Sequence, residues 1–135
     1  MKVAQIVLMF VAALVMSGCS DGCQNTELSS ARSPDGRWRA VMFQRDCGAT
    51  TGFSTQVSIL PMGKKLKGAG NTFVADDDHG AAARSAWGGP WASLRWIASD
   101  QLEVSHDARA HVFKANPTVN SVQIVFNKVT STPAG

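Results

Sequence analysis

The sequence predicts an all-β protein: a single small antiparallel domain of about seven strands that follows an amino-terminal signal helix. Three observations favour this fold. Short segments rich in β-branched and aromatic residues alternate between apolar and polar positions, as in "FSTQVSIL" at 53–60. Clusters of Gly, Pro, Asn and Asp separate these segments. No helical periodicity follows the first 18 residues. A meander, a sandwich and a partly closed barrel all fit this pattern.

Residues 1–18 have the composition of a signal peptide. Lys2 precedes an apolar run over 3–16 that only Gln5 interrupts. This run is shorter than the roughly 20 apolar residues that span a bilayer, and it has the length of a secretory hydrophobic region. The segment therefore predicts export.

The end of this segment resembles the lipobox of bacterial lipoproteins. Small residues, Ser17 and Gly18, directly precede Cys19, while Met16 stands where leucine is more usual. In that family of signals the cysteine receives a diacylglyceryl group and becomes the first residue of the mature chain. The resemblance implies lipidation of Cys19 and a membrane anchor. Since Ser20 follows rather than an aspartate, it also implies sorting to the outer membrane, facing the periplasm.

Beyond the signal, the composition predicts a tether at 19–34, a β domain at 35–130 and a frayed tail at 131–135. The domain starts at the type I turn signal "SPDG". Neither face of the first strand is purely polar, so we expect that strand to be central and covered on both sides. Seven strands are expected, at 37–45, 53–60, 72–75, 91–97, 101–106, 110–114 and 121–129.

Charge and motifs exclude several functional classes. The net charge is only +3 at pH 7, with no long basic block, so no nucleic-acid partner is expected. The segment "GATTGFST" lacks the lysine of a phosphate-binding loop, and no G-x-S-x-G motif is present. We therefore expect no cofactor and no catalytic residue.

Two cysteines remain if Cys19 is lipidated. Export places Cys23 and Cys47 in an oxidising compartment, where disulfides form and persist. A catalytic Cys47 would need a histidine or a helix amino terminus to lower the pKa of its thiol, and no local signature supplies one. The sequence therefore predicts a Cys23–Cys47 disulfide.

The acidic segment "DDDHG" is the best polar cluster. Asp76, Asp78 and His79 are weak candidates for a metal site, because oxygen ligands suit calcium. Adjacent residues on an extended chain point apart, however, and a solvated acidic loop is the alternative. His106 and His111 would lie on opposite faces of a continuous strand, unless a turn at "DARA" reverses the chain. No metal site is therefore expected.

The segment "WGGPWASLRW" supplies a possible binding surface. Trp87, Trp91 and Arg95 could form an exposed platform for a glycan, a peptide or a lipid headgroup. The alternative is that the tryptophans are buried, which is the commoner position of large aromatic side chains.

The segments "SPDGRWRAVMFQRDCGATTGFSTQVSIL", "GGPWASLRW" and "ARAHVFK" resemble an uncharacterised family of small bacterial lipoproteins. The resemblance covers most of the mature chain and implies a compact domain without assigning an activity. The expected function is a non-enzymatic binding or structural module at the membrane surface, with an envelope protein or a glycan as partner. The alternatives are an inhibitor or immunity-type binder of an envelope-directed enzyme, and a metal-binding protein or hydrolase.

Overall fold

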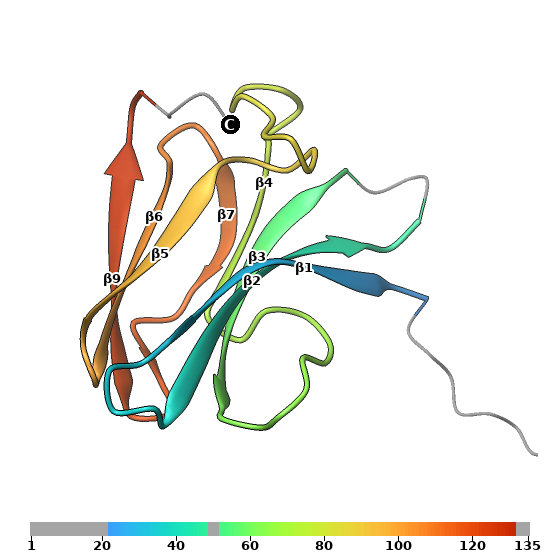
Figure 1. The fold of residues 1–135 in the computed structure, drawn as a ribbon. Coiled ribbons are helices and arrows are strands. Elements are labelled where there is room, and N and C mark those ends of the chain that lie inside the picture. Colours follow the sequence, from blue (N-terminus) through green and yellow to red (C-terminus); the bar gives the residue numbers. More distant parts are fainter. Residues whose placement is uncertain (1–21, 49–51, 132–135) are drawn as a thin grey trace, which may run out of the picture.

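The computed structural model describes residues 22–48 and 52–131. Within these ranges the protein forms nine strands in two sheets and no helix, which confirms the predicted all-β fold (Figure 1). No helix in the described ranges is long and apolar enough to cross a membrane. The signal segment and Cys19 lie outside the described residues, as does the tail after Ser131.

The first sheet has five strands, and every neighbouring pair in it is antiparallel. Its order is β1 (Gln24–Arg32), β2 (Trp38–Asp46), β3 (Ser54–Pro61), β4 (Phe73–Asp76) and β7 (His111–Ala115). The predicted turn before β2 is present, because the Gly36 N–H donates to the Ser33 carbonyl across 2.9 Å. Gly36 has a φ of 74°, a conformation that glycine adopts without steric cost.

The second sheet has four strands, and one of its pairings is parallel. Its order is β5 (Ala92–Ala98), β6 (Gln101–Asp107), β9 (Val122–Val129) and β8 (Thr118–Val119). After β6 the chain crosses to the five-stranded sheet to form β7, and it returns through β8. Because of this excursion, β9 runs parallel to β6, which differs from a purely antiparallel arrangement.

All seven predicted strands are present, but the predicted tether at 19–34 is wrong for most of its length. Gln24–Arg32 forms β1, which pairs with β2 over eight registered positions. Most β1 side chains are exposed, because β1 is an edge strand, and only Leu28 among them packs against the core cluster. The segment therefore lacks the apolar alternation by which a strand is recognised.

The core fills the space between the two sheets. Residues that alternate along β2, β3 and β4 face residues of β5, β6 and β9. Its fully or almost fully buried members are Ala40, Met42, Val57, Ile59, Phe73, Ala75, Ala92, Leu102, Val104, Val122 and Ile124. Along one edge of the sandwich, the Trp96 indole N–H donates to the Ala31 carbonyl across 2.9 Å and links β5 to β1.

The opposite face of the five-stranded sheet is covered by the loop 62–72. Gly70 N donates to the Gln56 side-chain oxygen across 2.8 Å, and Asn25 donates to the Gly68 carbonyl across 2.8 Å. Val41 and Phe43, on this face of β2, have no exposed surface. The prediction that this strand is central and covered on both sides is confirmed.

Candidate functional site

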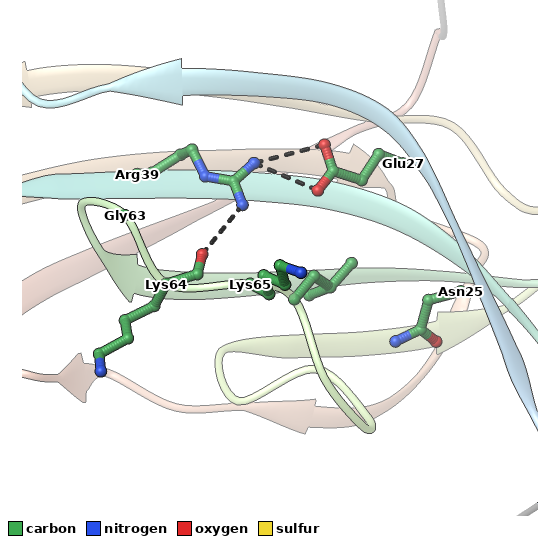
Figure 2. A pocket seen from close by; sticks show the side chains of 7 residues that line it. Asn25, Glu27, Arg39, Gly63, Lys64 and Lys65 are labelled. Carbon is green, nitrogen blue, oxygen red and sulfur yellow. Dashed lines mark hydrogen bonds and ion pairs between the residues drawn. The ribbon is translucent and has the colours of Figure 1, made fainter. Parts of the chain in front are cut away.

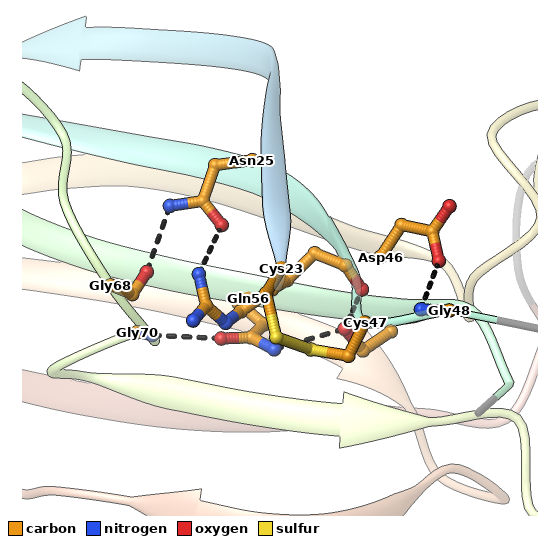
Figure 3. The surroundings of a disulfide bond; sticks show 10 residues. Cys23, Asn25, Asp46, Cys47, Gly48, Gln56, Gly68 and Gly70 are labelled. Carbon is orange, nitrogen blue, oxygen red and sulfur yellow. Dashed lines mark hydrogen bonds between the residues drawn. A yellow bond between two sulfur atoms is a disulfide. The ribbon is translucent and has the colours of Figure 1, made fainter. Parts of the chain in front are cut away.

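The predicted disulfide joins Cys23, just before β1, to Cys47, just after β2. Figure 3 shows it beside a small polar network on the same end of the sheet. Asn25 accepts a hydrogen bond from the Arg45 guanidinium across 2.8 Å, and Gly48 N donates to the Asp46 carboxylate across 3.0 Å. A covalent bond and side-chain contacts thus hold the amino end of β1 on the five-stranded sheet.

Trp87 belongs to the interior and not to an exposed platform. Its side chain is half-buried and packs against the core cluster. Its indole N–H donates across 2.9 Å to the hydroxyl of Thr55, a residue with no exposed surface. This hydrogen bond to a buried residue accounts for Trp87 in structural terms, so the hypothesis of an aromatic surface centred on it is not supported.

Trp91 and Arg95 lie on the outer face of the four-stranded sheet, away from the core. Ala92 is buried, and alternation along β5 places its neighbours on the other side. Arg95 is exposed and forms an ion pair with Glu103 at 3.1 Å. Since Trp87 points into the core, the three residues of the predicted surface do not form one platform.

The acidic segment is divided between two faces. Asp76 and His79 line a hollow on the outer face of the five-stranded sheet, whereas Asp78 lines a different cleft. Positive φ angles at Asp78 and His79, 50° and 55°, turn the chain sharply here. Asp77 is buried and paired with Arg84 at 2.8 Å. Among the described residues, no three His, Cys, Asp or Glu side chains are grouped so that they could hold a metal ion.

A groove of about 500 Å³ lies between β1, β2 and the loop 62–72 (Figure 2). The Arg39 guanidinium at its centre contacts both carboxylate oxygens of Glu27, at 3.2 and 3.3 Å, and the Lys64 carbonyl at 3.3 Å. Arg39 therefore ties the loop to β1, and its charge is already balanced. The groove offers the exposed amines of Lys64 and Lys65 to a ligand but no unpaired arginine.

A larger hollow, which we call the inter-sheet cleft, has a volume of about 660 Å³. It lies where β7 on one sheet faces β6 and β9 on the other. Its lining residues are Asp78, His106, Ala108, Ala110, His111, Val112, Ala115, Phe126 and Lys128. More than half of these residues are apolar, with a few polar groups among them, which is the usual composition of a small-molecule site.

His106 is the deepest polar group of this cleft. Its side chain is only 3% exposed, and its ring lies 5.0 Å from that of Phe73. Nδ1 lies 3.0 Å from the Asp107 carbonyl, which can only accept a hydrogen bond, so Nδ1 carries a proton. In the neutral ring Nε2 is then an acceptor. Within the described part of the chain Nε2 has no hydrogen-bond partner, and it is not sealed from the cleft.

Lys128 lies beside His106 on the neighbouring strand. The two residues are register partners in the parallel β6–β9 pair and line the same cleft. Lys128 forms no ion pair with any residue in 22–48 or 52–131. Phe126, two residues earlier on the same face, stacks on Phe73 at 6.0 Å. A cation, a hydrogen-bond acceptor and an aromatic wall thus meet at one place.

Asp107 faces away from the cleft and is fully buried. The Arg109 guanidinium contacts its two carboxylate oxygens at 3.0 and 2.8 Å, and the Arg109 N–H contacts one of them at 2.8 Å. The side-chain hydrogen bonds from Arg109 hold the pKa of Asp107 below its usual value, against the opposing effect of burial. This pair tightens the turn between β6 and β7, in which Ala110 N also donates to the Asp107 carbonyl.

The same turn explains why His106 and His111 line one cleft. On a continuous strand they would point to opposite sides, but the chain reverses at "DARA" and crosses between the sheets. Sequence reasoning recognised that turn as an open alternative, and it missed the partnership with Lys128.

Comparisons with protein-family models, with curated proteins and with solved structures found no match for this chain.

Proposed function

We propose that this chain is a lipid-anchored protein of the bacterial cell envelope that binds another envelope component without catalysing a reaction. The position of the Cys23–Cys47 bridge is the observation that supports this location best. Cys23 lies four residues after Cys19, and at roughly 3.3–3.6 Å per residue this segment spans at most about 14 Å. A lipid on Cys19 would hold β1 close to the membrane surface.

The anchor itself is supported by the lipobox-like end of the signal segment. One acyl chain gives marginal attachment, whereas two or more give stable attachment. A diacylglyceryl group on Cys19 would therefore keep the domain at the membrane. Ser20 supports the outer membrane as its location, with the domain facing the periplasm.

The binding role is supported by the inter-sheet cleft. Five of its nine lining residues are apolar, and the polar ones are Asp78, His106, His111 and Lys128. Its described lining residues include no serine, threonine or cysteine that could act as a nucleophile. Two other regions supply further surface for an envelope protein or a glycan. One is the groove between β1, β2 and the loop 62–72, and the other is the exposed face of the four-stranded sheet that bears Arg95.

The intact mass of membrane-extracted protein tests the anchor. We expect a mass equal to residues 19–135 plus a diacylglyceryl group and any further acyl chain. Alkylation without reduction should add no mass, and alkylation after reduction should modify two thiols, those of Cys23 and Cys47. The Cys19→Ala variant should lose the lipid mass and should not appear as the mature form in the outer-membrane fraction.

The matched control is the double variant Cys23→Ala/Cys47→Ala. It lacks the bridge but retains Cys19, so its lipid mass should be unchanged. A wild-type chain that reaches the envelope with an unmodified Cys19 would contradict the anchor. A lipidated chain found only in the inner membrane would contradict the proposed outer-membrane location but not the lipid anchor.

A further inference from the structure

The side chains of His106 and Lys128 form a pair of complementary groups inside the inter-sheet cleft. They lie on adjacent parallel strands, on the same face, beside the ring of Phe126. Lys128 offers a cation that no described residue neutralises, and His106 Nε2, which is open to the cleft, offers an acceptor that no described residue satisfies. A mostly apolar hollow with a few polar groups facing it is the usual form of a ligand site, and these two groups are the ones that would orient the ligand.

We propose that the inter-sheet cleft binds a carboxylate whose adjacent carbon bears an O–H or N–H donor and an apolar side group. In this arrangement the carboxylate pairs with Lys128 Nζ, and the neighbouring donor bonds to His106 Nε2. The apolar group lies against Phe126 and Val112. This inference rests on the proposed binding role and is independent of the lipid anchor.

The tautomer of His106 decides which ligand group it takes. Because Nδ1–H donates to the Asp107 carbonyl, neutral Nε2 is an acceptor and would repel a second carboxylate oxygen. A ligand with only a carboxylate would leave Nε2 unsatisfied. A ligand with a donor next to its carboxylate satisfies both groups, because register partners on adjacent strands are separated by about 4.8 Å.

Two kinds of molecule present this chemistry. One is a small 2-hydroxy acid with an apolar side group, and the other is the carboxyl-terminal residue of a polypeptide, which supplies the N–H. The remaining charged group on the rim, Asp78, would disfavour a second negative charge on the ligand. The site therefore fits a monoanion.

The test is a ¹⁹F NMR titration of the full chain in phosphatidylcholine nanodiscs, with empty nanodiscs as the reference. The acid probes are 3-(4-fluorophenyl)lactate for a free acid and N-acetyl-4-fluorophenylalanine for a polypeptide end. We expect at least one of them to bind with a dissociation constant below about 1 mM. Two analogues remove one group each: N-acetyl-4-fluorophenylalanine amide lacks the carboxylate, and 3-(4-fluorophenyl)propanoate lacks the donor.

Loss of either group should weaken binding about tenfold or more, the usual scale for a charge-assisted or buried hydrogen bond. Lys128→Gln should weaken binding of the acid probe to a similar extent and leave the amide unaffected. Lys65→Gln, in the exposed loop that lines the other groove, is the matched control and should change nothing. The donor-lacking analogue tests His106 without altering a buried side chain.

Binding of only one acid probe would identify which source of the carboxylate the cleft accepts. Equal binding of acid and amide, equal binding with and without the donor, equal effects of Lys128→Gln and Lys65→Gln, or no acid binding below about 1 mM would each overturn the inference. An unlipidated Cys19 would contradict the anchor and leave these results unchanged, so the two failures are distinguishable.

Discussion

Trp87 donates its indole N–H to the hydroxyl of Thr55 across 2.9 Å. The same hydroxyl donates to the Pro90 carbonyl at 2.6 Å, so one buried oxygen serves two parts of the loop that connects β4 to β5. Thr55 lies on β3 and has no exposed surface. The loop is therefore fastened to the middle of the five-stranded sheet, and Trp87 is held in the core by a specific bond.

Thr55→Val should destabilise the fold by about 2–3 kcal/mol. Valine preserves the shape but removes the hydroxyl, which leaves the Trp87 indole N–H and the Pro90 carbonyl without their partner. Urea unfolding measured by tryptophan fluorescence would give the change in the free energy of unfolding. Thr26→Val, at an exposed position on β1, is the control and should change it by less than about 0.5 kcal/mol. Equal effects of the two variants would contradict the role of this hydroxyl.

Gly89→Ala should destabilise the same junction by steric conflict. A Cβ at Gly89 would lie 2.6 Å from the Thr55 hydroxyl oxygen and 3.0 Å from backbone atoms of Ser54. Because the conflict involves backbone, we expect a loss of about 1–3 kcal/mol in the same unfolding measurement. Gly52→Ala is the matched control, since nothing lies within 4 Å of its Cβ. If Gly89→Ala left the free energy of unfolding unchanged, the β4–β5 loop would not be packed closely on β3.

The strands that sequence analysis predicted are those with many apolar and β-branched residues, several of which alternate with polar residues along the chain. In β3, Val57 and Ile59 are core residues and Leu60 is half-buried on the other face, so the period of two is visible locally. β1 was missed because it is an edge strand held mainly by backbone pairing and the Cys23–Cys47 bond. Backbone pairing leaves little trace in side-chain composition.

The disulfide could be predicted because two features of the sequence point to it. The signal-like segment predicts export to an oxidising compartment, and two cysteines remain to form a pair. The inter-sheet cleft could not be predicted, because it depends on the parallel pairing of β6 and β9. That pairing follows from the crossing of the chain through β7, and no local pattern encodes it. His106 and Lys128 are therefore adjacent in space without any signal in the sequence.

The Asp107–Arg109 pair should make stability depend on acid pH. The folded-state pKa of Asp107 lies below the value of about 3.9 expected in the unfolded chain. The stabilisation that ionised Asp107 gives the fold is therefore fully present above the unfolded-state pKa. It is lost as the pH falls through the folded-state pKa. Asp107→Asn should lower the free energy of unfolding by about 1–3 kcal/mol at pH 7.

The difference between wild type and Asp107→Asn should narrow as the pH falls below about 4, because protonation removes the charge that the variant lacks. Chemical unfolding at a series of pH values between 2 and 7 would show this. The difference between wild type and Arg109→Gln should narrow in the same way, since this variant removes the side-chain hydrogen bonds that are the largest cause of the lowered pKa of Asp107. A difference that stays constant across the series would mean that the carboxylate charge of Asp107 does not contribute to stability.

Removal of the disulfide should release β1 before the rest of the sheet. The Cys23–Cys47 bond spans 24 positions, and closing a loop of this size lowers the entropy of the unfolded chain by an amount equivalent to about 3 kcal/mol. We expect Cys23→Ala/Cys47→Ala to lose stability on this scale and to stay folded, because the core cluster contains no residue of β1 among its fully buried members.

Hydrogen exchange would locate the effect. Amides of β1 that pair with β2 should lose protection in the double variant, whereas amides of β6 and β9 should keep most of theirs. Trp96 supplies the matched comparison, because its indole holds the far end of β1 through the Ala31 carbonyl. Trp96→Phe should loosen Ala31 and its neighbours and leave the Cys23 end protected. Uniform loss of protection in both variants would mean that β1 unfolds only together with the whole sandwich.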